Sequence, residues 1–499
     1  MKHSEAMSEP RNVSELVGRA AALHPDKPAL VAGARTVTWA ELEGLVAAAA
    51  AGLVARGLAA GERVGLLLPN GIEFAVAYFG VLRAGLVALP LNTAYTPTEI
   101  GYQLADSGAA LVIAAESLAG LAAESSVDVI SLGSDAWTAL LSPAEGGLAG
   151  SRGGAEDLAV LLYTSGTSGR PKGAMLSHRA LLANLAQLAQ IEPAVVAPDD
   201  RVLLVLPLFH VYGLNSGLGM TAYVGATGVL AERFDPVETL SLVEAEQVSN
   251  IVGAPPMYVA WSMLPRVSES LVSLRLAVSG SAPLPPPVLG SLLETSGHHV
   301  FEGYGLTETA PVVTTTLCSE VAKPGSIGRP IPGVELRLLD DNGEEVHEDD
   351  PGEIVVRGAN LFSGYWPDGQ GGPDADGWFR TGDVAVADDD GDLFLVDRVR
   401  ELILVSGFNV YPREVEDALS GHPLVAEVAV IGIPHPYTGE TVKAFVVPAE
   451  GASPTADDII EYAARRLARF KCPTAVEIVA ELPHSAIGKV AKGRLRESA

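Results

Sequence analysis

A loop rich in glycine, hydroxyl groups and positive charge interrupts the apolar sequence at residues 163–173. It reads Tyr-Thr-Ser-Gly-Thr-Ser-Gly-Arg-Pro-Lys-Gly and follows an apolar run that predicts a strand over 158–163. Glycine lets backbone amides approach phosphate oxygens, hydroxyl groups donate further hydrogen bonds, and Lys172 adds a positive charge. The loop is not of the Walker A type, because Pro171 stands five residues after Gly166 in place of a Gly-Lys pair. We therefore predict a phosphate-binding loop of another kind.

Five further motifs combine glycine or proline with side chains that can do chemistry. In chain order they end at His210 (Pro-Leu-Phe-His), Pro283 (Ser-Gly-Ser-Ala-Pro), Glu308 (Gly-Tyr-Gly-Leu-Thr-Glu), Asp383 (Trp-Phe-Arg-Thr-Gly-Asp) and Lys489 (Leu-Pro-His-Ser-Ala-Ile-Gly-Lys). Each motif alone has an ordinary structural interpretation, such as a core histidine, a turn, a helix N-terminus or a solvated lysine. No Gly-x-Ser-x-Gly elbow occurs, which disfavours a serine hydrolase. Only the whole set, in this order, predicts a function.

The set resembles the adenylate-forming superfamily, which contains acyl-CoA synthetases, carrier-protein adenylation domains and beetle luciferases. The resemblance extends along nearly the full chain, because residues 24–31 (HPDKPALV) and 84–92 (AGLVALPLN) are similar to N-terminal segments of that family. Three positions depart from the family pattern. Ser168 stands where threonine is more common, Arg400 where lysine or aspartate is usual, and Ile487 where a small polar residue is frequent.

The resemblance implies an α/β fold with two domains. The larger one, expected over residues 1–397, is an adenylate-forming domain of layered sheets and helices that binds ATP and the acid. The smaller one, expected over residues 398–499, is a mobile α+β domain with the catalytic lysine and a tunnel for the thiol. A hinge near Arg400 is implied to join them.

The resemblance also implies roles for individual residues. Catalysis is assigned to His210, Thr307, Glu308 and Lys489, and Mg²⁺ binding to Glu308 and Thr164. ATP binding is assigned to a larger set: Thr164, Ser165, Gly166, Thr167, Ser168, Gly169, Lys172, Gly280, Ser281, Ala282, Glu302, Gly303, Tyr304, Gly305, Thr307, Asp383, Arg398 and Lys489. The acyl pocket is assigned to His210, Val211, Asn215, Met257, Tyr258, Ser279 and Leu306, and the coenzyme A tunnel to Ser406, Gly407 and Phe408. The charged members of the motifs are all present, which disfavours a non-catalytic binding protein.

The implied activity is that of an acyl-CoA synthetase. ATP and a carboxylic acid give an acyl-adenylate and pyrophosphate with Mg²⁺, and coenzyme A then takes the acyl group as a thioester. Apart from His210, the candidate pocket side chains are apolar or neutral, and residues 253–261 contain no arginine where malonate-activating relatives carry a carboxylate clamp. This favours a monocarboxylate, with a fatty acid ahead of an aryl acid. An acyl carrier protein is the alternative partner that would supply the thiol.

The elements that must position these motifs follow from the apolar pattern. A strand over 63–68, a helix over 72–84 and a strand over 86–91 form a β–α–β rhythm, which predicts largely parallel sheets. Near the C-terminus the pattern predicts two strands and an amphipathic helix, over 425–433, 443–447 and 457–469.

Three segments that contain several glycine or proline residues are predicted to be irregular or to mix strand with loop. The uncharged run over 202–231 predicts buried strand, loop and pocket wall, because Pro207, His210 and five glycines break a lipid-facing helix. Segment 146–156 predicts a flexible connection, and segment 365–377 a surface loop.

Composition bounds the partners and the location. The chain has 499 residues, 48% of them hydrophobic and 19% charged, which predicts a folded protein of more than one domain. A net charge of −28 disfavours nucleic acid and anionic membranes as partners, and no stable membrane insertion is expected. Two distant cysteines, Cys318 and Cys472, and an N-terminus without a signal sequence favour the cytoplasm. A monomer and a homodimer are both compatible with the sequence.

Overall fold

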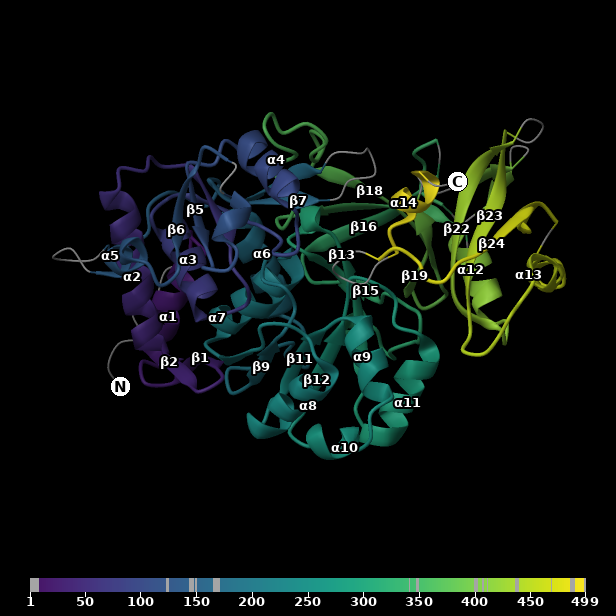
Figure 1. Cartoon of the computed structure of the whole chain (residues 1–499), viewed down its shortest axis with the longest axis horizontal. Helices are drawn as coiled ribbons and strands as arrows, with labels where there is room; N and C mark the ends of the chain where they lie inside the picture. The colour runs from purple at the N-terminus through teal and green to yellow at the C-terminus, as the bar shows by residue number, and fades with distance from the viewer. Residues whose placement is uncertain are drawn as a thin grey trace. The chain divides into compact units, whose positions relative to one another are not determined.

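The computed structural model (Figure 1) describes residues 9–122, 125–142, 148, 150–164, 171–340, 342–346, 350–398, 403–405, 408–410, 412–435, 439–467, 469–484 and 490–497. The chain divides into two compact units. The first consists of Met1–Glu335 and Arg357–Phe379, and the second of Leu336–Val356 and Arg380–Ala499.

A nine-stranded sheet forms one half of the first unit, in the order β15-β14-β13-β12-β11-β9-β10-β1-β2. Its strands are β1 (Pro28–Ala32), β2 (Arg35–Thr38), β9 (Arg201–Leu204), β10 (Thr227–Leu230), β11 (Asn250–Gly253), β12 (Leu276–Ser279), β13 (Val300–Gly305), β14 (Val312–Thr315) and β15 (Arg329–Pro330). The pairs from β1 through β10, β9, β11 and β12 to β13 are parallel. The loops that follow β9, β11, β12 and β13 therefore leave the sheet at the same edge.

A six-stranded sheet forms the other half, in the order β6-β5-β3-β4-β7-β8. Its strands are β3 (Arg63–Leu67), β4 (Val87–Pro90), β5 (Leu111–Ala114), β6 (Asp128–Ser131), β7 (Leu158–Thr164) and β8 (Lys172–Ser177). All neighbours pair parallel except β7 and β8, which form an antiparallel hairpin. The predicted β–α–β unit is confirmed, because helix α3 (Ile72–Arg83) connects the parallel strands β3 and β4.

Helices cover the sheets of the first unit. They are α1 (Glu15–Leu23), α2 (Trp39–Ala55), α3, α4 (Pro97–Ser107), α5 (Asp135–Leu141), α6 (His178–Leu188), α7 (Met220–Val224), α8 (Pro236–Ala245), α9 (Pro255–Ser262), α10 (Val267–Ser270) and α11 (Pro286–Ser296). Side-chain caps begin α2, α4, α5, α6 and α8. Thr96 and Glu99 form a capping box at α4, with Pro97 in its first turn. Figure 1 shows α8, α9, α10 and α11 beside β11 and β12, and Trp261 is fully buried in the core between them.

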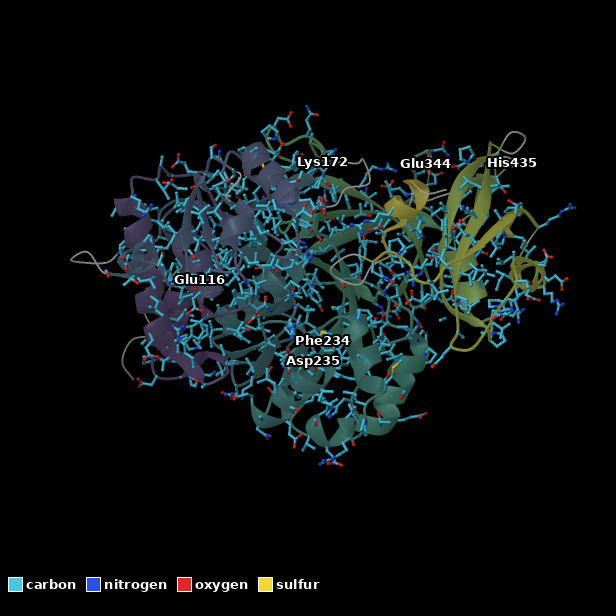
Figure 2. The ribbon with its side chains drawn as sticks, in the orientation of Figure 1. Glu116, Lys172, Phe234, Asp235, Glu344 and His435 are labelled. Atoms are coloured by element: carbon cyan, nitrogen blue, oxygen red, sulfur yellow. The ribbon has the colours of Figure 1, made fainter. Side chains whose placement is uncertain are left out.

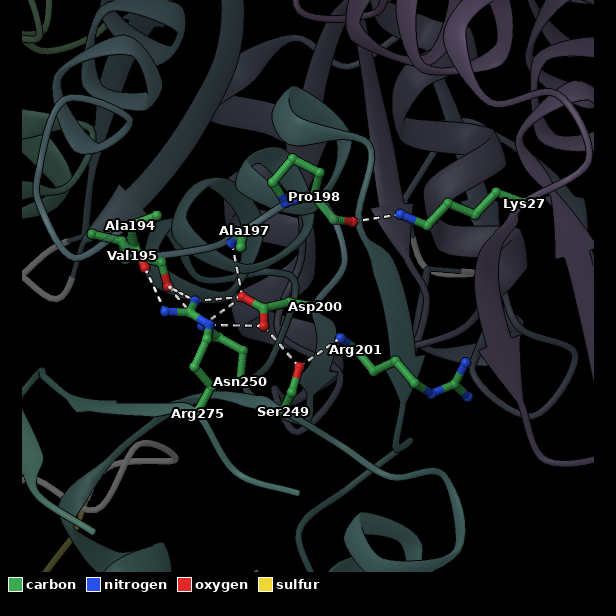
Figure 3. A network of polar contacts seen from close by, with 10 residues as sticks. All are labelled: Lys27, Ala194, Val195, Ala197, Pro198, Asp200, Arg201, Ser249, Asn250 and Arg275. Atoms are coloured by element: carbon green, nitrogen blue, oxygen red, sulfur yellow. Dashed lines mark hydrogen bonds and ion pairs between the residues drawn. The ribbon is translucent and has the colours of Figure 1, made fainter. Parts of the chain in front are cut away.

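A polar network holds the amino ends of β9, β11 and β12 together (Figure 3). Asp200, just before β9, accepts hydrogen bonds from Ser249 Oγ at 2.8 Å, from the Ala197 amide at 2.7 Å and from Arg275 Nε at 3.0 Å. Burial raises the pKa of the Asp200 carboxyl, but the bonds from Arg275, Ala197 and Ser249 outweigh burial and leave the pKa below its usual value. The network stabilises the edge of the sheet opposite to the loops that follow the strands.

The second unit contains two sheets and three α-helices among its described residues. One sheet has the order β16-β17-β18-β19, with β16 (Val334–Leu339), β17 (Gly352–Gly358), β18 (Trp378–Ala387) and β19 (Leu393–Arg398). The other has the order β21-β20-β23-β22, with β20 (Ile403–Val405), β21 (Phe408–Val410), β22 (Val425–His435) and β23 (Gly439–Pro448), and β24 (Ala475–Ile478) pairs parallel with β23. The helices are α12 (Pro412–Ser420), α13 (Ala456–Ala464) and α14 (Lys492–Glu497). The α+β character expected of the tail is confirmed.

The bounds of the two compact units differ from the domain boundary that we predict at 397/398. Residues 336–356 and 380–397 belong to the second unit, because the sheet β16–β19 packs there rather than with the large parallel sheets. The boundary that we predict at 397/398 concerns movement about Arg400, and it stays a prediction because residues 399–402 lie outside the described ones.

Three local predictions differ from the structure. The predicted helix over 457–469 is longer than the observed one, because α13 ends at Ala464. The chain then turns, and Leu467 packs on the core of the second unit. Segment 202–231 contains a π-helix, η2 (Tyr212–Gly219), where we predict a loop. Segment 365–377 does not start as a free loop, because Tyr365 forms a β-bridge with Ala174. Within the described part of the chain, no helix combines the length and the apolar sequence needed to cross a membrane.

Candidate active site

Strands β7 and β8 bring the two ends of the predicted phosphate loop together. Thr164 pairs with Lys172 across the hairpin, and its hydroxyl donates a long hydrogen bond of 3.5 Å to the Lys172 carbonyl oxygen. The Lys172 side chain is exposed at the start of β8 (Figure 2). The structure thus positions one hydroxyl and one cation of the predicted set. The other predicted loop residues, Ser165, Gly166, Thr167, Ser168 and Gly169, lie outside the described residues.

Residues 363–366, which we call the flanking segment, lie along β8 and are linked to it by an isolated antiparallel bridge between Tyr365 and Ala174. The amide of Ser363 donates to the Met175 carbonyl at 2.9 Å, and the amide of Trp366 donates to the Gly173 carbonyl at 2.8 Å. These bonds attach the segment to the strand that leaves the phosphate loop.

The predicted metal ligand lies beside this segment. Strand β13 leads into a 3-10 turn, η3 (Thr307–Thr309), on which Thr307 is half-buried and Glu308 is 8% exposed. The Tyr365 hydroxyl donates to Glu308 Oε1 at 2.5 Å, and Lys172 Nζ lies 5.4 Å from the centre of the Tyr365 ring. Thr164, Lys172, Tyr365 and Glu308 are therefore connected by successive contacts. Sequence reasoning missed Tyr365, because its glycine-, proline- and aspartate-rich surroundings have no strand pattern.

The residues at this point fit a magnesium ion. The Glu308 carboxylate receives no hydrogen bond from the described residues other than that from Tyr365, so Oε2 retains its lone pairs. Carboxylate and hydroxyl oxygens are the ligands that Mg²⁺ takes in proteins, usually one or two of them together with substrate phosphates. Glu308 and Thr164 carry oxygen atoms of these two kinds, and their binding of Mg²⁺ stays a prediction.

Asn70 holds the loop that contains His210. Asn70 is 8% exposed and lies three residues after β3, and its side-chain amide donates to the Leu206 carbonyl at 2.9 Å and to the Ala231 carbonyl at 3.2 Å. Its oxygen accepts from the Leu208 amide at 2.9 Å. The bonds join the six-stranded sheet to the ends of β9 and β10, and they fix the chain two residues before the half-buried His210. Sequence reasoning missed Asn70, although a Pro-Asn-Gly turn directly after a buried strand was a usable signal.

Two tyrosines fill the space beside two glycines at strand ends. Tyr258 is a predicted acyl-pocket residue, and Tyr212 directly follows the predicted pocket residue Val211. A methyl group on Gly253, at the end of β11, would lie 2.7 Å from the Tyr258 hydroxyl, and one on Gly280, just after β12, would lie 3.0 Å from Cζ of Tyr212. Burial raises the pKa of the Tyr258 phenol well above its usual value, and the nearby Tyr212 adds to this. Both phenols are thus neutral, and Tyr258 donates to the Val278 carbonyl at 2.8 Å.

The other predicted pocket residues divide into buried and half-buried groups. Ser279, at the end of β12, is 1% exposed, and its hydroxyl has no hydrogen-bond partner among the described residues. Asn215 is equally buried on η2, and its amide donates to the Leu181 carbonyl at 3.1 Å and to the Ala310 carbonyl at 2.8 Å. The geometry gives the Asn215 amide a scaffold role, while its pocket role stays a prediction. Val211 and Met257 are buried, and Leu306 is half-buried.

The predicted ATP residues follow β12 or lie on β13, and the segments that follow these two strands contain two backbone positions of unusual conformation. Ser281 has φ 74° and Ala310 has φ 61°, in the left-handed region that non-glycine residues seldom adopt. Such strain frequently marks ligand sites. The Glu302 carboxylate accepts from the Leu284 amide at 3.0 Å, which anchors the loop after β12 to β13. The remaining members of this predicted set, Gly280, Ala282, Gly303, Tyr304 and Gly305, lie on the same loop or on β13.

The second unit holds the other predicted nucleotide residues. Asp383 on β18 and Arg398 on β19 are directly paired, and Asp383 is buried. Phe408 begins β21, and only the backbone of Arg398 and Phe408 is described. Four further predicted residues lie outside the described ones: the predicted catalytic Lys489, the predicted hinge residue Arg400, and Ser406 and Gly407 of the predicted thiol tunnel.

Comparison with known proteins agrees with this arrangement. Residues 17–366 match the model of the AMP-binding enzyme family, and residues 414–489 match that of the AMP-binding enzyme C-terminal domain. A feruloyl-CoA synthase of Amycolatopsis sp is 40% identical over 96% of this chain and 97% of its own, and a long-chain-fatty-acid–CoA ligase of Bacillus subtilis (strain 168) is 33% identical over 98% and 94%. The crystal structure of ATP-bound MatB from Rhodopseudomonas palustris superimposes with a TM-score of 0.89 at 36% identity, covering 98% of this chain and 99% of that one.

The fold, the layered sheets and the site define an adenylate-forming enzyme. The chain belongs to the AMP-binding enzyme family. Within it, the protein is an AMP-forming acid–thiol ligase, an acyl-CoA synthetase that uses ATP, Mg²⁺ and coenzyme A.

Proposed function

We propose that this ligase activates an aromatic monocarboxylic acid and transfers it to coenzyme A. The observation that carries the proposal is the pair of tyrosine rings at the strand ends. Tyr212 lies against Gly280, and Tyr258 lies against Gly253. Rigid rings with neutral phenols suit a flat aryl group, and the rings occupy space that a long flexible chain would need.

The Ser279 hydroxyl supports an acid with a polar substituent. A hydroxyl group that is 1% exposed and has no partner among the described residues costs free energy unless a ligand or a water molecule satisfies it. A ring hydroxyl or methoxy group on the acid would do so.

The relatives support two substrate classes. The Amycolatopsis protein, at 40% identity, is named for the aryl acid ferulate, and this agrees with the aromatic pocket. The Bacillus subtilis protein, at 33% identity, is named for long-chain fatty acids. The sequence alone favours a fatty acid; with the tyrosines in view we place the aryl acid first and keep the fatty acid as the second candidate.

In the first step, an oxygen of the acid's carboxylate attacks the α-phosphorus of ATP, a P–O bond forms, and pyrophosphate leaves with the electron pair of the broken bond. We assign Lys172 and the phosphate loop to the polyphosphate, and Lys489 to both the carboxylate and the α-phosphate. Two like-charged reactants need such cations, because a charge pair at about 4 Å is worth roughly 4 kcal/mol at an effective dielectric of 20. Bound at Glu308 and Thr164, Mg²⁺ would neutralise phosphate oxygens.

In the second step, the coenzyme A thiolate attacks the acyl carbonyl carbon, and AMP leaves with the electrons of the broken C–O bond. We assign Asp383 and Arg398 to the ribose, and Ser406, Gly407 and Phe408 to the thiol tunnel. Movement of the tail about Arg400 would replace Lys489 by the tunnel between the two steps. His210 would close the mouth of the acyl pocket.

An acid panel tests the proposal. Purified protein receives ATP, Mg²⁺ and coenzyme A with hydroxycinnamic, benzoic, medium-chain and long-chain acids, and pyrophosphate and thioester mass are measured. We expect the largest kcat/KM for a substituted aryl acid. A larger value for a fatty acid would overturn the aryl assignment. If none of the acids leads to release of pyrophosphate, the activity itself is overturned. A parallel reaction with a phosphopantetheinylated carrier protein distinguishes the two thiol acceptors, and light scattering distinguishes monomer from homodimer.

A further inference from the structure

Tyr365 occupies a position between two opposite charges that the ATP site must keep apart. Its hydroxyl donates to Glu308 Oε1 at 2.5 Å, and its ring lies 5.4 Å from Lys172 Nζ. Lys172 and Glu308, both described, form no ion pair with each other. A direct pair between them would neutralise the cation meant for phosphate and occupy the carboxylate meant for the metal.

The geometry points to Tyr365 as a positioning residue that orients Glu308 for a divalent metal and holds Lys172 away from it. The phenol can do both because it has two different binding surfaces. The hydroxyl is a hydrogen-bond donor to a carboxylate, and the ring face attracts an ammonium group within about 6 Å. This inference rests on the proposed binding of Mg·ATP at Glu308 and Thr164.

The backbone around Tyr365 is rigid enough for this role. The flanking segment is bonded to β8 on both sides of Tyr365, through Ser363 and Trp366. The Phe362 amide donates to the Glu308 carbonyl oxygen at 2.9 Å, and the Phe362 ring packs edge-on against the Tyr365 ring with centroids 5.1 Å apart. The tyrosine, the metal-binding carboxylate and the strand that carries Lys172 are thereby held as one body.

The hydrogen bond takes one carboxylate oxygen and leaves the other for a cation. Glu308 Oε1 accepts from Tyr365, while Oε2 accepts from no described residue. A carboxylate held in this way binds metal through the free oxygen without losing side-chain entropy at that moment. Hydrogen-bonded carboxylates of this kind raise metal affinity at other sites by about 10- to 100-fold.

The test measures binding rather than turnover. Mn²⁺ replaces Mg²⁺, α,β-methylene-ATP replaces ATP, and water-proton relaxation gives the dissociation constant of the Mn²⁺·nucleotide complex. A second titration with the nucleotide in EDTA gives the affinity without metal. Tyr365→Phe removes only the hydroxyl, and Tyr365→Leu removes the aromatic ring as well. The matched control is Tyr462→Phe, which loses a phenol hydroxyl bonded to the Gly421 carbonyl in the second unit.

We expect Tyr365→Phe to weaken Mn²⁺·nucleotide binding about tenfold, as for loss of a hydrogen bond to a charged group, with metal-free binding unchanged. Tyr365→Leu weakens both, because Lys172 then pairs with Glu308. In a Glu308→Gln background Tyr365→Phe adds no further loss, since the hydroxyl acts through that carboxylate. The inference is overturned if Tyr365→Phe binds the Mn²⁺·nucleotide complex as tightly as the wild type. It is also overturned if Tyr365→Phe weakens this binding as much in the Glu308→Gln background as in the wild-type background. Failure of the wild-type protein to bind either nucleotide form overturns the proposed function instead.

Discussion

Asp383 on β18 stands directly opposite Arg398 on β19, so two residues fifteen positions apart in the sequence are paired across an antiparallel ladder. The Asp383 side chain is buried, and its amide is fixed by the Thr381 hydroxyl at 3.1 Å. A buried carboxylate with a fixed backbone is suited to accept hydrogen bonds from a ribose.

The first prediction concerns this carboxylate. Asp383→Ala is expected to raise the KM for ATP by about tenfold or more, because hydrogen bonds between the ribose and a charged group are lost. Steady-state kinetics at saturating acid and coenzyme A measure the change. Asp383→Asn, which keeps one acceptor oxygen, is expected to fall between wild type and alanine. An unchanged KM for ATP in both variants contradicts the ribose assignment.

The second prediction separates the two half-reactions. Lys489→Ala is expected to abolish acyl-adenylate formation, because the cation that holds the carboxylate near the α-phosphate is removed. Thioester formation from supplied acyl-AMP is expected to survive. ATP–pyrophosphate exchange and thioester mass spectrometry measure the two steps. If both steps fall equally, Lys489 does not have the assigned role.

The third prediction concerns the buried Ser279 hydroxyl of the pocket. Ser279→Ala is expected to raise the KM for a ring-hydroxylated acid about three- to tenfold, because one hydrogen bond is lost. The KM for the same acid without the ring substituent is expected to stay constant, and it serves as the control. Equal effects on the two acids would show that the Ser279 hydroxyl does not contact the substituent.

The fourth prediction concerns the link between the sheets. Asn70→Ala is expected to lower the free energy of unfolding by about 1–3 kcal/mol, because buried carbonyl and amide groups lose their partner. Asn70→Asp is expected to be worse, since a carboxylate cannot donate to the Leu206 and Ala231 carbonyl oxygens. Urea unfolding measures both. The KM for the acid should rise in both variants, while that for ATP changes little.

The fifth prediction is a pH dependence of stability. Burial lowers the pKa of His178 to about 4, and its Nδ1 accepts from the Val13 amide at 3.1 Å. In the unfolded chain the pKa is about 6.5. Above pH 6.5 the His178 side chain is neutral in both the folded and the unfolded state, and its contribution to the free energy of unfolding is complete. As the pH falls from 6.5 to 4, His178 binds a proton in the unfolded chain but stays neutral in the folded protein, so stability is lost.

The loss amounts to about 3 kcal/mol between these pH values, at 1.36 kcal/mol for each unit of pKa difference. Urea unfolding at pH 7, 6, 5 and 4.5 measures it. His178→Asn, which does not titrate, is expected to remove this part of the slope. A His178→Asn slope equal to that of wild type contradicts the assignment.

The amino-acid sequence by itself determined the fold class and the order of the motifs. The β–α–β unit over 63–91 was predictable because its apolar periodicity is local, and β3, α3 and β4 match it within two residues. The motifs were predictable as a set, because their order along the chain matches the family pattern, although each motif alone has an ordinary structural interpretation. Nucleotide chemistry near Lys172, Glu308 and Asp383 is therefore implied by the resemblance of the whole motif set to the adenylate-forming superfamily, and it stays a prediction.

Tertiary structure decided which residues meet. The contact between Tyr365 and Glu308 joins segments 57 positions apart, and Asn70 meets Leu208 across 138 positions. No local pattern encodes such pairs, because they depend on how the flanking segment and the two sheets pack. The contact between Tyr212 and Gly280 could not be predicted for the same reason. It forms because a π-helix, which no pattern in the glycine-rich sequence predicts, lies against the end of β12.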